Sequence, residues 1–301
     1  KRVRAEFIGR LPDDEISERL SGYHQVLCVV NTRKHAREIY EKITGKDCFH
    51  LSALMCPVHR TRKLDRIREA LKAGNPCRVV STQLVEAGVD LDFPVVFRSA
   101  AGIDSIAQAA GRCNREGKLD EGGKVFVFLP EDGLPAGDLR LNAETAEMVM
   151  GHHEDILSPD AVREYFETNF WRRGDDQLDR EGILQDLREG GMKGDLPFKG
   201  VAGKFRMIED GMETVIVPYD ENAEKLIRQL RYSEYSGGIA RKLQRYTVQI
   251  YPRVLAALET AGAVERIQER FCVLMNKDIY SEKLGLCPED PSFFKVESLI
   301  C

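Results

Sequence analysis

Short apolar runs alternate with amphipathic segments over the first part of the chain. The run from Val26 to Val30 is flanked by polar residues and has the pattern of a buried parallel strand. The same pattern predicts further strands at 48–51, 78–81, 95–98 and 125–129, with helices at 34–43, at 59–73 and from about residue 105. Alternating strands and helices predict an α/β domain with a parallel sheet flanked by helices.

The pattern changes after Pro130, where residues 131–138 are rich in Gly, Pro and acidic residues and indicate a connector. Helical patterns follow at 142–151, 160–170 and 177–188. Strand patterns at 214–217 and 246–250 and helical patterns at 221–230 and 252–261 predict a small α+β module. We therefore expect four parts: an N-terminal extension (1–21), an α/β lobe (22–130), a helical connector (131–195) and a C-terminal accessory domain (196–301).

Composition narrows the class of protein. No apolar run approaches the roughly 20 residues that span a bilayer, and no apolar stretch follows the basic first residues, so we expect a cytoplasmic protein without a membrane partner. The eight cysteines contain no C-x-x-C pair and indicate reduced thiols. Residues 1–130 hold 22 Lys and Arg against 17 Asp and Glu, and the remainder holds 22 against 32. This balance favours a phosphate-bearing partner for the first part only.

The first segment with candidate chemistry runs from Ser81 to Asp92, directly after a predicted strand. Open parallel sheets bind ligands at the carboxyl ends of their strands. Thr82 could hold a nucleic-acid phosphate, and Asp90 could accept a hydrogen bond from a ribose or orient an arginine. The alternative is that Ser81 and Thr82 only cap a short helix.

The second segment contains Gln108, Gly111, Arg112 and Arg115, which would share one face of a continuous helix. Guanidinium groups offer fixed forks of donors, and a glycine lets a partner approach closely, so this face suits a phosphate. Arginines that reach a γ-phosphate stabilise the charge of the transition state. The alternative is that Ser105 and Gln108 form a capping box and the arginines are solvated, which leaves both arginines unexplained.

Gln-x-x-Gly-Arg-x-x-Arg at 108–115 resembles motif VI of superfamily 2 helicases, and 82–90 resembles their motif V. More narrowly, both segments resemble the helicase-nuclease of type I CRISPR interference systems, which is recruited to an R-loop and degrades the displaced DNA strand. Val29 to Thr32 resembles the family's motif IV, and His59-Arg60-x-x-Lys63 lies where the family carries an arginine-bearing helix. Residues 198–208, 215–230 and 241–251 resemble its accessory domain. The family usually carries a bulkier polar residue and a small one at Ala87-Gly88.

The resemblance implies a second RecA-like lobe and assigns roles to individual residues. Arg112 and Arg115 would be catalytic, and Asp90, Gln108 and Gly111 would bind the nucleotide. The residues implied at the nucleic acid are Thr32, Arg60, Thr82, Gln83 and Glu86. The implied partners are single-stranded DNA, a first RecA-like lobe, a metal-dependent nuclease domain and a CRISPR surveillance complex.

Other motifs of such an enzyme do not occur in this sequence. Gly45-Lys46, Gly123-Lys124 and Gly203-Lys204 are each followed by the wrong residue for a phosphate loop. The sequence also contains no Walker-B Asp-Glu-x-His/Asp and no His-Asp pair of a nuclease. We therefore expect ATP and Mg²⁺ to bind at a site shared with a first lobe. The chain alone should bind no metal and should be inactive as an ATPase and as a nuclease.

Two other functions remain open on the sequence. The acidic C-terminal part could make the chain a docking module that recruits a motor to a partner complex. The lobe could also belong to an RNA helicase, because contacts to the phosphate backbone do not easily distinguish the two sugars.

Overall fold

The computed structural model describes residues 2–43, 45, 47–205 and 211–288. The chain forms two compact units, one made of Lys1–Leu134 with Met212–Cys301 and the other of Pro135–Gly211. Residues 206–208, part of one segment expected to resemble the accessory domain, lie outside the described residues, as do residues 289–301.

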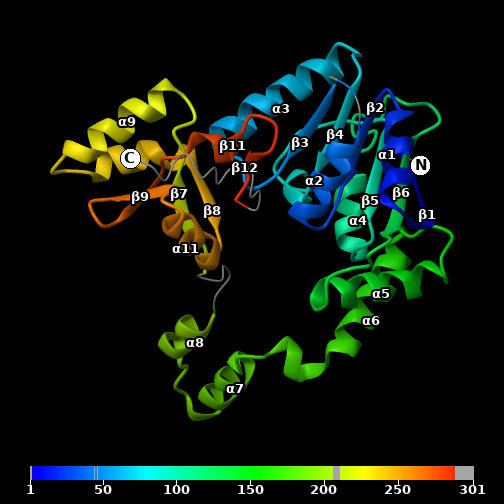
Figure 1. The fold of residues 1–301 in the computed structure, drawn as a ribbon. Coiled ribbons are helices and arrows are strands. Elements are labelled where there is room, and N and C mark those ends of the chain that lie inside the picture. The colour runs from blue at the N-terminus through cyan, green and yellow to red at the C-terminus, as the bar shows by residue number, and fades with distance from the viewer. Residues whose placement is uncertain (1, 44, 46, 206–210, 289–301) are drawn as a thin grey trace. The chain divides into compact units, whose positions relative to one another are not determined.

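The first unit contains a six-stranded sheet in which every neighbouring pair is parallel, which confirms the predicted fold class (Figure 1). Its order is β1-β6-β5-β2-β4-β3. The strands are β1 (Val3–Leu11), β2 (Gln25–Val29), β3 (Cys48–Leu51), β4 (Cys77–Ser81), β5 (Val95–Ser99) and β6 (Gly123–Pro130). Residues 3–21, which the sequence pattern leaves as an extension, supply β1 and the first helix to this sheet.

Helices cover both faces of the sheet. They are α1 (Asp13–Ser21), α2 (Arg33–Lys42), α3 (Pro57–Lys72) and α4 (Ile103–Ala110), with a short 3-10 helix η1 (Gln83–Val85) after β4. Ile16 of α1 and Ile39 of α2 pack in one cluster with Val26, Cys28 and Phe97 of the strands. Right-handed crossovers place α3 and α4 on the opposite face, because their connections run along the sheet in the other direction.

The C-terminal part of this unit is an α+β module, as predicted. Its mixed sheet has the order β8-β7-β10-β9. Its elements are β7 (Glu213–Ile216), α9 (Glu221–Tyr232), α10 (Gly237–Leu243), η2 (Gln244–Tyr246), β8 (Thr247–Ile250), α11 (Pro252–Thr260), β9 (Val264–Ile267), β10 (Phe271–Leu274), η3 (Lys277–Ile279), β11 (Tyr280–Ser281) and β12 (Gly285–Leu286). The sequence pattern finds two of the four sheet strands and misses the short β9 and β10.

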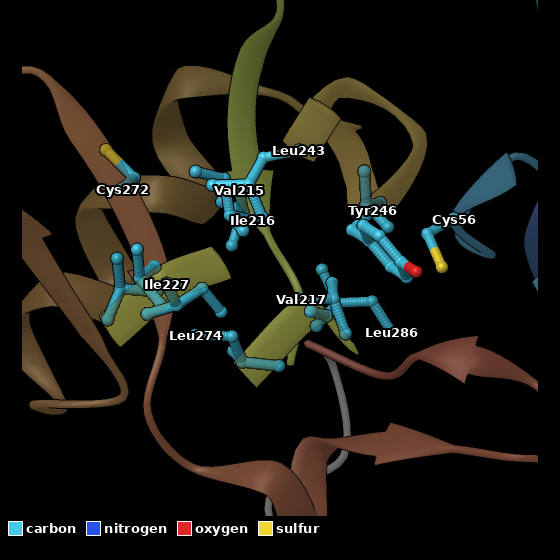
Figure 2. Packing of buried hydrophobic residues seen from close by; sticks show 14 of the residues in the cluster. Cys56, Val215, Ile216, Val217, Ile227, Leu243, Tyr246, Cys272, Leu274 and Leu286 are labelled. Carbon is cyan, nitrogen blue, oxygen red and sulfur yellow. The ribbon is translucent and has the colours of Figure 1, made fainter. Parts of the chain in front are cut away.

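The start of α3 in the α/β lobe joins the hydrophobic core of this module. Cys56 is buried in the same cluster as Val217 and Leu286 of the module (Figure 2). Val58 belongs to that cluster as well. The Leu286 N–H donates to the Leu54 carbonyl at 2.8 Å. A Cβ at Gly285 would lie 2.5 Å from that carbonyl oxygen, and φ there is +83°, so only glycine fits.

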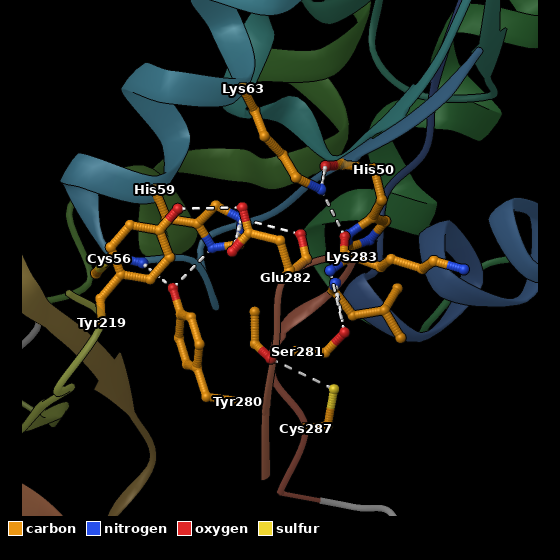
Figure 3. A network of polar contacts seen from close by, with 12 residues as sticks. His50, Cys56, His59, Lys63, Tyr219, Tyr280, Ser281, Glu282, Lys283 and Cys287 are labelled. Carbon is orange, nitrogen blue, oxygen red and sulfur yellow. Dashed lines mark hydrogen bonds and ion pairs between the residues drawn. The ribbon is translucent and has the colours of Figure 1, made fainter. Parts of the chain in front are cut away.

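Polar contacts reinforce this joint at His59, whose side chain is fully buried (Figure 3). Its Nε2 lies 3.0 Å from the Glu282 carbonyl, which can only accept, so Nε2 carries the proton. Nδ1 then accepts from the Tyr280 hydroxyl at 2.9 Å, and that hydroxyl accepts from the Cys56 N–H at 3.0 Å. The Tyr219 ring stacks on the imidazole with centroids 4.9 Å apart. Every polar atom of the imidazole is therefore satisfied in the neutral state.

Lys63, one turn further along α3, is also buried. Its ammonium donates to the Lys283 carbonyl at 2.7 Å and to the His50 carbonyl at 3.3 Å (Figure 3). Burial lowers the pKa of Lys63 to about 8. Lys63 thus ties β3 and α3 to the loop between β11 and β12.

The second unit contains α5 (Asp138–Met150), α6 (Pro159–Leu178), α7 (Ile183–Lys193) and α8 (Phe198–Lys204). The backbone of α6 leaves helical geometry at Gly174, where φ is +65°. Arg172 and Arg173 of α6 bind Glu144 and Asp138 of α5 at 3.0 and 2.8 Å. None of the helices in the described residues combines the length and the apolar character that a membrane crossing requires.

We expect stability to fall in acid because of His59. Burial lowers the pKa of His59 to about 4 from 6.5, so the unfolded chain binds more protons between these values. Its contribution is present above pH 6.5 and is lost as the pH falls to 4, a change of about 3 kcal/mol. Urea unfolding of His59→Gln from pH 7 to 4 should show a shallower pH dependence than the wild type. The exposed His24→Gln is the matched control, and equal slopes for His59→Gln and the wild type would contradict the assignment.

Candidate functional site

The first group of candidate residues lies where β2 and β4 end at the carboxyl edge of the sheet. Thr32 follows β2 and caps α2, since its Oγ1 accepts from the His35 N–H at 3.1 Å. Thr82 follows β4, and its N–H donates to the Leu51 carbonyl at 3.3 Å. The Thr82 side chain makes no capping bond to η1, so the alternative of a purely capping role does not apply to it. Gln83 is exposed beside it.

A buried ion pair lies directly behind this edge. The Arg98 guanidinium of β5 is fully buried, and its Nε lies 2.8 Å from the Glu86 carboxylate, which is also buried. Burial raises the pKa of Glu86 and lowers that of Arg98, and the partner opposes each shift. The nucleic-acid contact expected of Glu86 is therefore wrong, because its carboxylate faces Arg98 inside the lobe and not the solvent.

Arg98 extends the pair to the end of β2. Its Nη1 donates to Asn31 Oδ1 and to the Ser99 carbonyl, both at 2.7 Å. The Asn31 amide then donates to the Ala100 carbonyl at 2.8 Å and to Ser99 Oγ at 3.1 Å. Asn31 precedes Thr32, so the buried arginine fixes the turn that presents Thr32 at the sheet edge.

Arg112 holds the other side of the same segment. Its Nε donates to the Val85 carbonyl at 2.7 Å, and its Nη2 donates to the Glu86 carbonyl at 2.6 Å. Burial and the neighbouring charge of Arg115 lower the pKa of Arg112. The guanidinium is half-buried and makes no hydrogen bond through Nη1 within the part of the chain that the structure describes.

Arg115 is held by two carboxylates at the end of the Ser81–Asp92 segment. Its Nη1 lies 2.5 Å from Asp90 Oδ1, and its backbone N–H donates to Asp92 Oδ1 at 2.6 Å. Both side chains of the Arg115–Asp90 pair are exposed. Asp90 thus orients an arginine in this structure, one of the two roles that the sequence leaves open.

The expected helical face of the second segment is wrong. Helix α4 ends at Ala110, and Gly111 is its C-cap, so the two arginines follow the helix instead of lying on it. Phe93 pairs with Cys113 across this stretch, and Asn114 has a positive φ of 44°. Gln108 remains on the exposed part of α4. The backbone of residues 112–114 pairs with Phe93, and this pairing brings Arg115 to Asp90. Helical spacing alone would not predict that contact.

Arg60 lies on α3 and is half-exposed. Its neighbours His59 and Lys63 are buried and make hydrogen bonds to Tyr280 and to the Lys283 carbonyl of the accessory module. Sequence reasoning assigned no individual role to Asn31 or Arg98. The signal for Arg98 is a charged residue directly after the apolar run 93–97.

The arginines fit a phosphate, whereas a cation finds no comparable site. Among the residues that the structure describes, no group of three or more His, Cys, Asp or Glu side chains is placed to hold a metal ion. His152 and His153 both contact Glu164. A nucleotide at Arg112 and Arg115 would need its Mg²⁺ ligands from another chain or segment.

Part of this chain is similar in sequence to known CRISPR-associated proteins. The family model described as the CRISPR-associated nuclease/helicase Cas3, C-terminal, matches residues 22–118. The CRISPR-associated nuclease/helicase Cas3 of Haloferax volcanii is 47% identical over 35% of this chain and 14% of its own length. The matched curated relatives are covered over only 14 to 21% of their lengths. The chain resembles the C-terminal part of the Cas3 helicase.

Solved structures agree on the fold. The crystal structure of T. fusca Cas3-ATP superposes with a TM-score of 0.59 at 14% identity, covering 91% of this chain and 39% of that one. A chain of a CRISPR RNA-guided surveillance complex, pre-nicking, superposes with a TM-score of 0.55 at 15% identity, covering 91% of this chain and 41% of that one. The lobe therefore has a RecA-like α/β fold.

Loss of one partner of the buried ion pair should strongly destabilise the lobe. We expect Arg98→Leu or Glu86→Leu alone to cost about 3–5 kcal/mol of unfolding free energy, since each leaves a buried charge without its partner. The double substitution should cost clearly less than the sum of the two. A double-mutant cycle by urea unfolding measures this coupling. Additive losses would show that the pair does not act as a unit.

Proposed function

We propose that this chain is the second RecA-like lobe, with its accessory domain, of an ATP-dependent translocase that moves on single-stranded DNA in type I CRISPR interference. The observation that carries the proposal is the pair of arginines on the turn after α4, where Arg115 pairs with Asp90 and Arg112 binds the Val85 and Glu86 carbonyls. The likeness to the C-terminal part of Cas3 supports it. The motor is completed by a first RecA-like lobe.

In this proposal Arg115 and Arg112 contact the γ-phosphate of ATP bound mainly by the first lobe. Asp90 keeps Arg115 oriented before the nucleotide arrives, since the two side chains are already paired. Arg112 offers Nη1 while its other nitrogens hold the Val85 and Glu86 carbonyls. Both guanidinium groups stabilise the negative charge that develops during phosphoryl transfer. Mg²⁺ that accompanies ATP would supply further positive charge at the phosphates, and its ligands would come from outside this lobe.

Gln108 and Gly111 lie at the end of α4 next to these arginines. We assign Gln108 to hydrogen bonding with the nucleotide and Gly111 to close approach of the opposite lobe. Gly111 has an ordinary helical φ of -63°, so its role would come from its size and not from a special backbone conformation.

Nucleic acid would lie along the carboxyl edge of the sheet, on Thr32, Thr82 and Gln83, with Arg60 at its margin. A continuous set of polar contacts joins this edge to the nucleotide end. Arg112 binds the backbone of Glu86, the Glu86 side chain binds Arg98, and Arg98 binds Asn31 beside Thr32. A shift of Arg112 on phosphate binding would therefore displace groups that position the strand.

The implied nuclease domain and the surveillance complex are partners of the whole enzyme. A chain in a pre-nicking surveillance complex has the same fold, which supports a recruiting complex as partner. The chain offers no metal cluster in its described residues for nuclease chemistry of its own.

ATP turnover tests the proposal. The chain alone should show none, and mixing it with a first RecA-like lobe should give turnover stimulated by single-stranded DNA. Arg115→Ala should then lower kcat by about 10³-fold or more, because an arginine finger contributes about that much. Arg19→Ala is the matched control, since Arg19 is equally exposed (42% against 41%) and also paired with a carboxylate.

Each alternative predicts a different outcome of this experiment. Stimulation by single-stranded RNA but not by DNA would favour an RNA helicase lobe. Full activity of Arg115→Ala would show that Arg115 is not part of the ATP site. Binding of a partner complex without any ATP turnover would favour a docking module. Turnover by the chain alone would contradict the shared site.

A further inference from the structure

A hollow with a cationic rim lies within the accessory module. Its volume is about 470 Å³, and its lining comes from the strands β7, β8 and β10 together with α10 and η2. Ile216, Leu243 and Cys272 belong to this lining and are labelled in Figure 2. None of the residues that we place at the nucleotide or at the nucleic acid lines it. A hollow of this size can hold a side chain of a bound partner.

Two arginines at this hollow have no carboxylate partner. Arg241 of α10 and Arg270, directly before β10, both line it and are both exposed. The Arg270 guanidinium lies 5.3 Å from the centroid of Phe271, and neither arginine forms an ion pair within the residues that the structure describes. The described lining also contains no Asp or Glu. Two uncompensated guanidinium groups beside one hollow favour an anionic ligand.

The positive charge continues along α10 and η2. Lys242 and Arg245 lie in the same stretch of chain as the lining residues, are exposed and form no ion pair in the described part of the chain. Two acidic residues border the lining in sequence, Glu213 at the start of β7 and Glu269 before β10. The cations on the α10 side therefore exceed the acids on the strand side. A ligand with several negative charges fits this rim better than a single anion.

The lining itself is partly apolar. Ile216 and Leu243 line the hollow and are buried, while Thr214, Gln244 and Thr247 add hydroxyl and amide groups. An apolar side chain that entered the hollow would remove further apolar surface from water. The hollow therefore fits a segment that carries an apolar side chain between acidic residues.

A protein segment fits this site better than a strand of nucleic acid. Grooves for single strands stack bases on aromatic rings. Phe271 is the one aromatic residue in the described lining, and it is half-buried with the Arg270 guanidinium over its ring. The ring is thus a poor platform for a base, whereas the arginines remain suited to carboxylates.

We propose that this hollow is a docking site for an acidic segment of a partner protein. Arg241 and Arg270 bind two carboxylates of the segment, and an apolar side chain between them enters the hollow against Ile216 and Leu243. Recognition of acidic motifs by clustered arginines is a recurring mode of peptide binding. The accessory module thereby carries a protein contact that does not depend on the shared ATP site.

Binding of an acidic peptide tests this site. The probe is fluorescein-labelled Asp-Glu-Asp-Phe-Glu-Asp-Glu, titrated with the full chain and followed by fluorescence anisotropy. Arg241→Ala/Arg270→Ala should weaken binding about 10-fold or more, since loss of a single charge-assisted hydrogen bond already costs about that much. Ala240→Trp fills the hollow without removing charge and should also weaken binding. A probe with Ser in place of Phe should bind the wild type less tightly.

The matched control is Arg33→Ala/Arg253→Ala, which should bind the probe like the wild type. It removes the same charge from two arginines that lie over Tyr251, at 5.5 and 5.8 Å from the ring centroid, and that line a different hollow. Circular dichroism checks that Ala240→Trp folds, and if it does not, the two double variants and the Ser probe decide.

Several results would overturn the docking site. Equal losses in both double variants would show general electrostatic attraction, and equal binding of the Ser and Phe probes would show that the hollow is not entered. Absence of probe binding to the wild type would overturn it as well. Oligo(dT) that displaces the probe, and whose own binding is lost in Arg241→Ala/Arg270→Ala, would identify a nucleic-acid surface instead. Because no ATP is present, each result stands independently of the Arg115 turnover test.

Discussion

The ion pair between Glu86 and Arg98 is the constraint around which the lobe is organised. A charged pair inside a parallel sheet is costly to desolvate, and further hydrogen bonds offset part of that cost. Nη1 of Arg98 donates to Asn31 and to the Ser99 carbonyl, whereas Nη2 has no hydrogen-bond partner in the described chain. The Glu86 carbonyl accepts from Arg112. The three turns that carry Thr32, Thr82 and Arg112 are therefore fixed by one another.

The accessory module packs directly against the lobe at α3 and β3. The imidazole of His59, the ammonium of Lys63 and the close approach at Gly285 all place groups of α3 and β3 against β11 and β12. Separating the two would expose the core shared by Cys56, Val58 and the module. The module is therefore fixed against the lobe by packing and by buried polar contacts.

The two ends of the proposed motor differ in physical character. At the nucleotide end, Arg115 and Asp90 are exposed and pair with each other, so they can exchange partners at small desolvation cost. At the nucleic-acid edge, the hydroxyl of Thr32 is fixed by its role as a helix cap, and the turn behind it is held by buried bonds. A ligand can thus reorient the first end easily, while the second end responds only if the buried network moves.

The sequence alone determined the parallel α/β lobe and the α+β module, and it singled out the two segments that hold the candidate residues. Apolar periodicity and residue order are local properties of the chain, and they sufficed for these. Tertiary structure decided the rest. Helical spacing placed Arg112 and Arg115 on α4, but pairing of Phe93 with Cys113 takes them off it and onto the Asp90 side. The resemblance placed Glu86 at the nucleic acid, but its carboxylate pairs inside the lobe with Arg98 from a different strand. Such contacts join residues distant in the chain, and no local pattern encodes them.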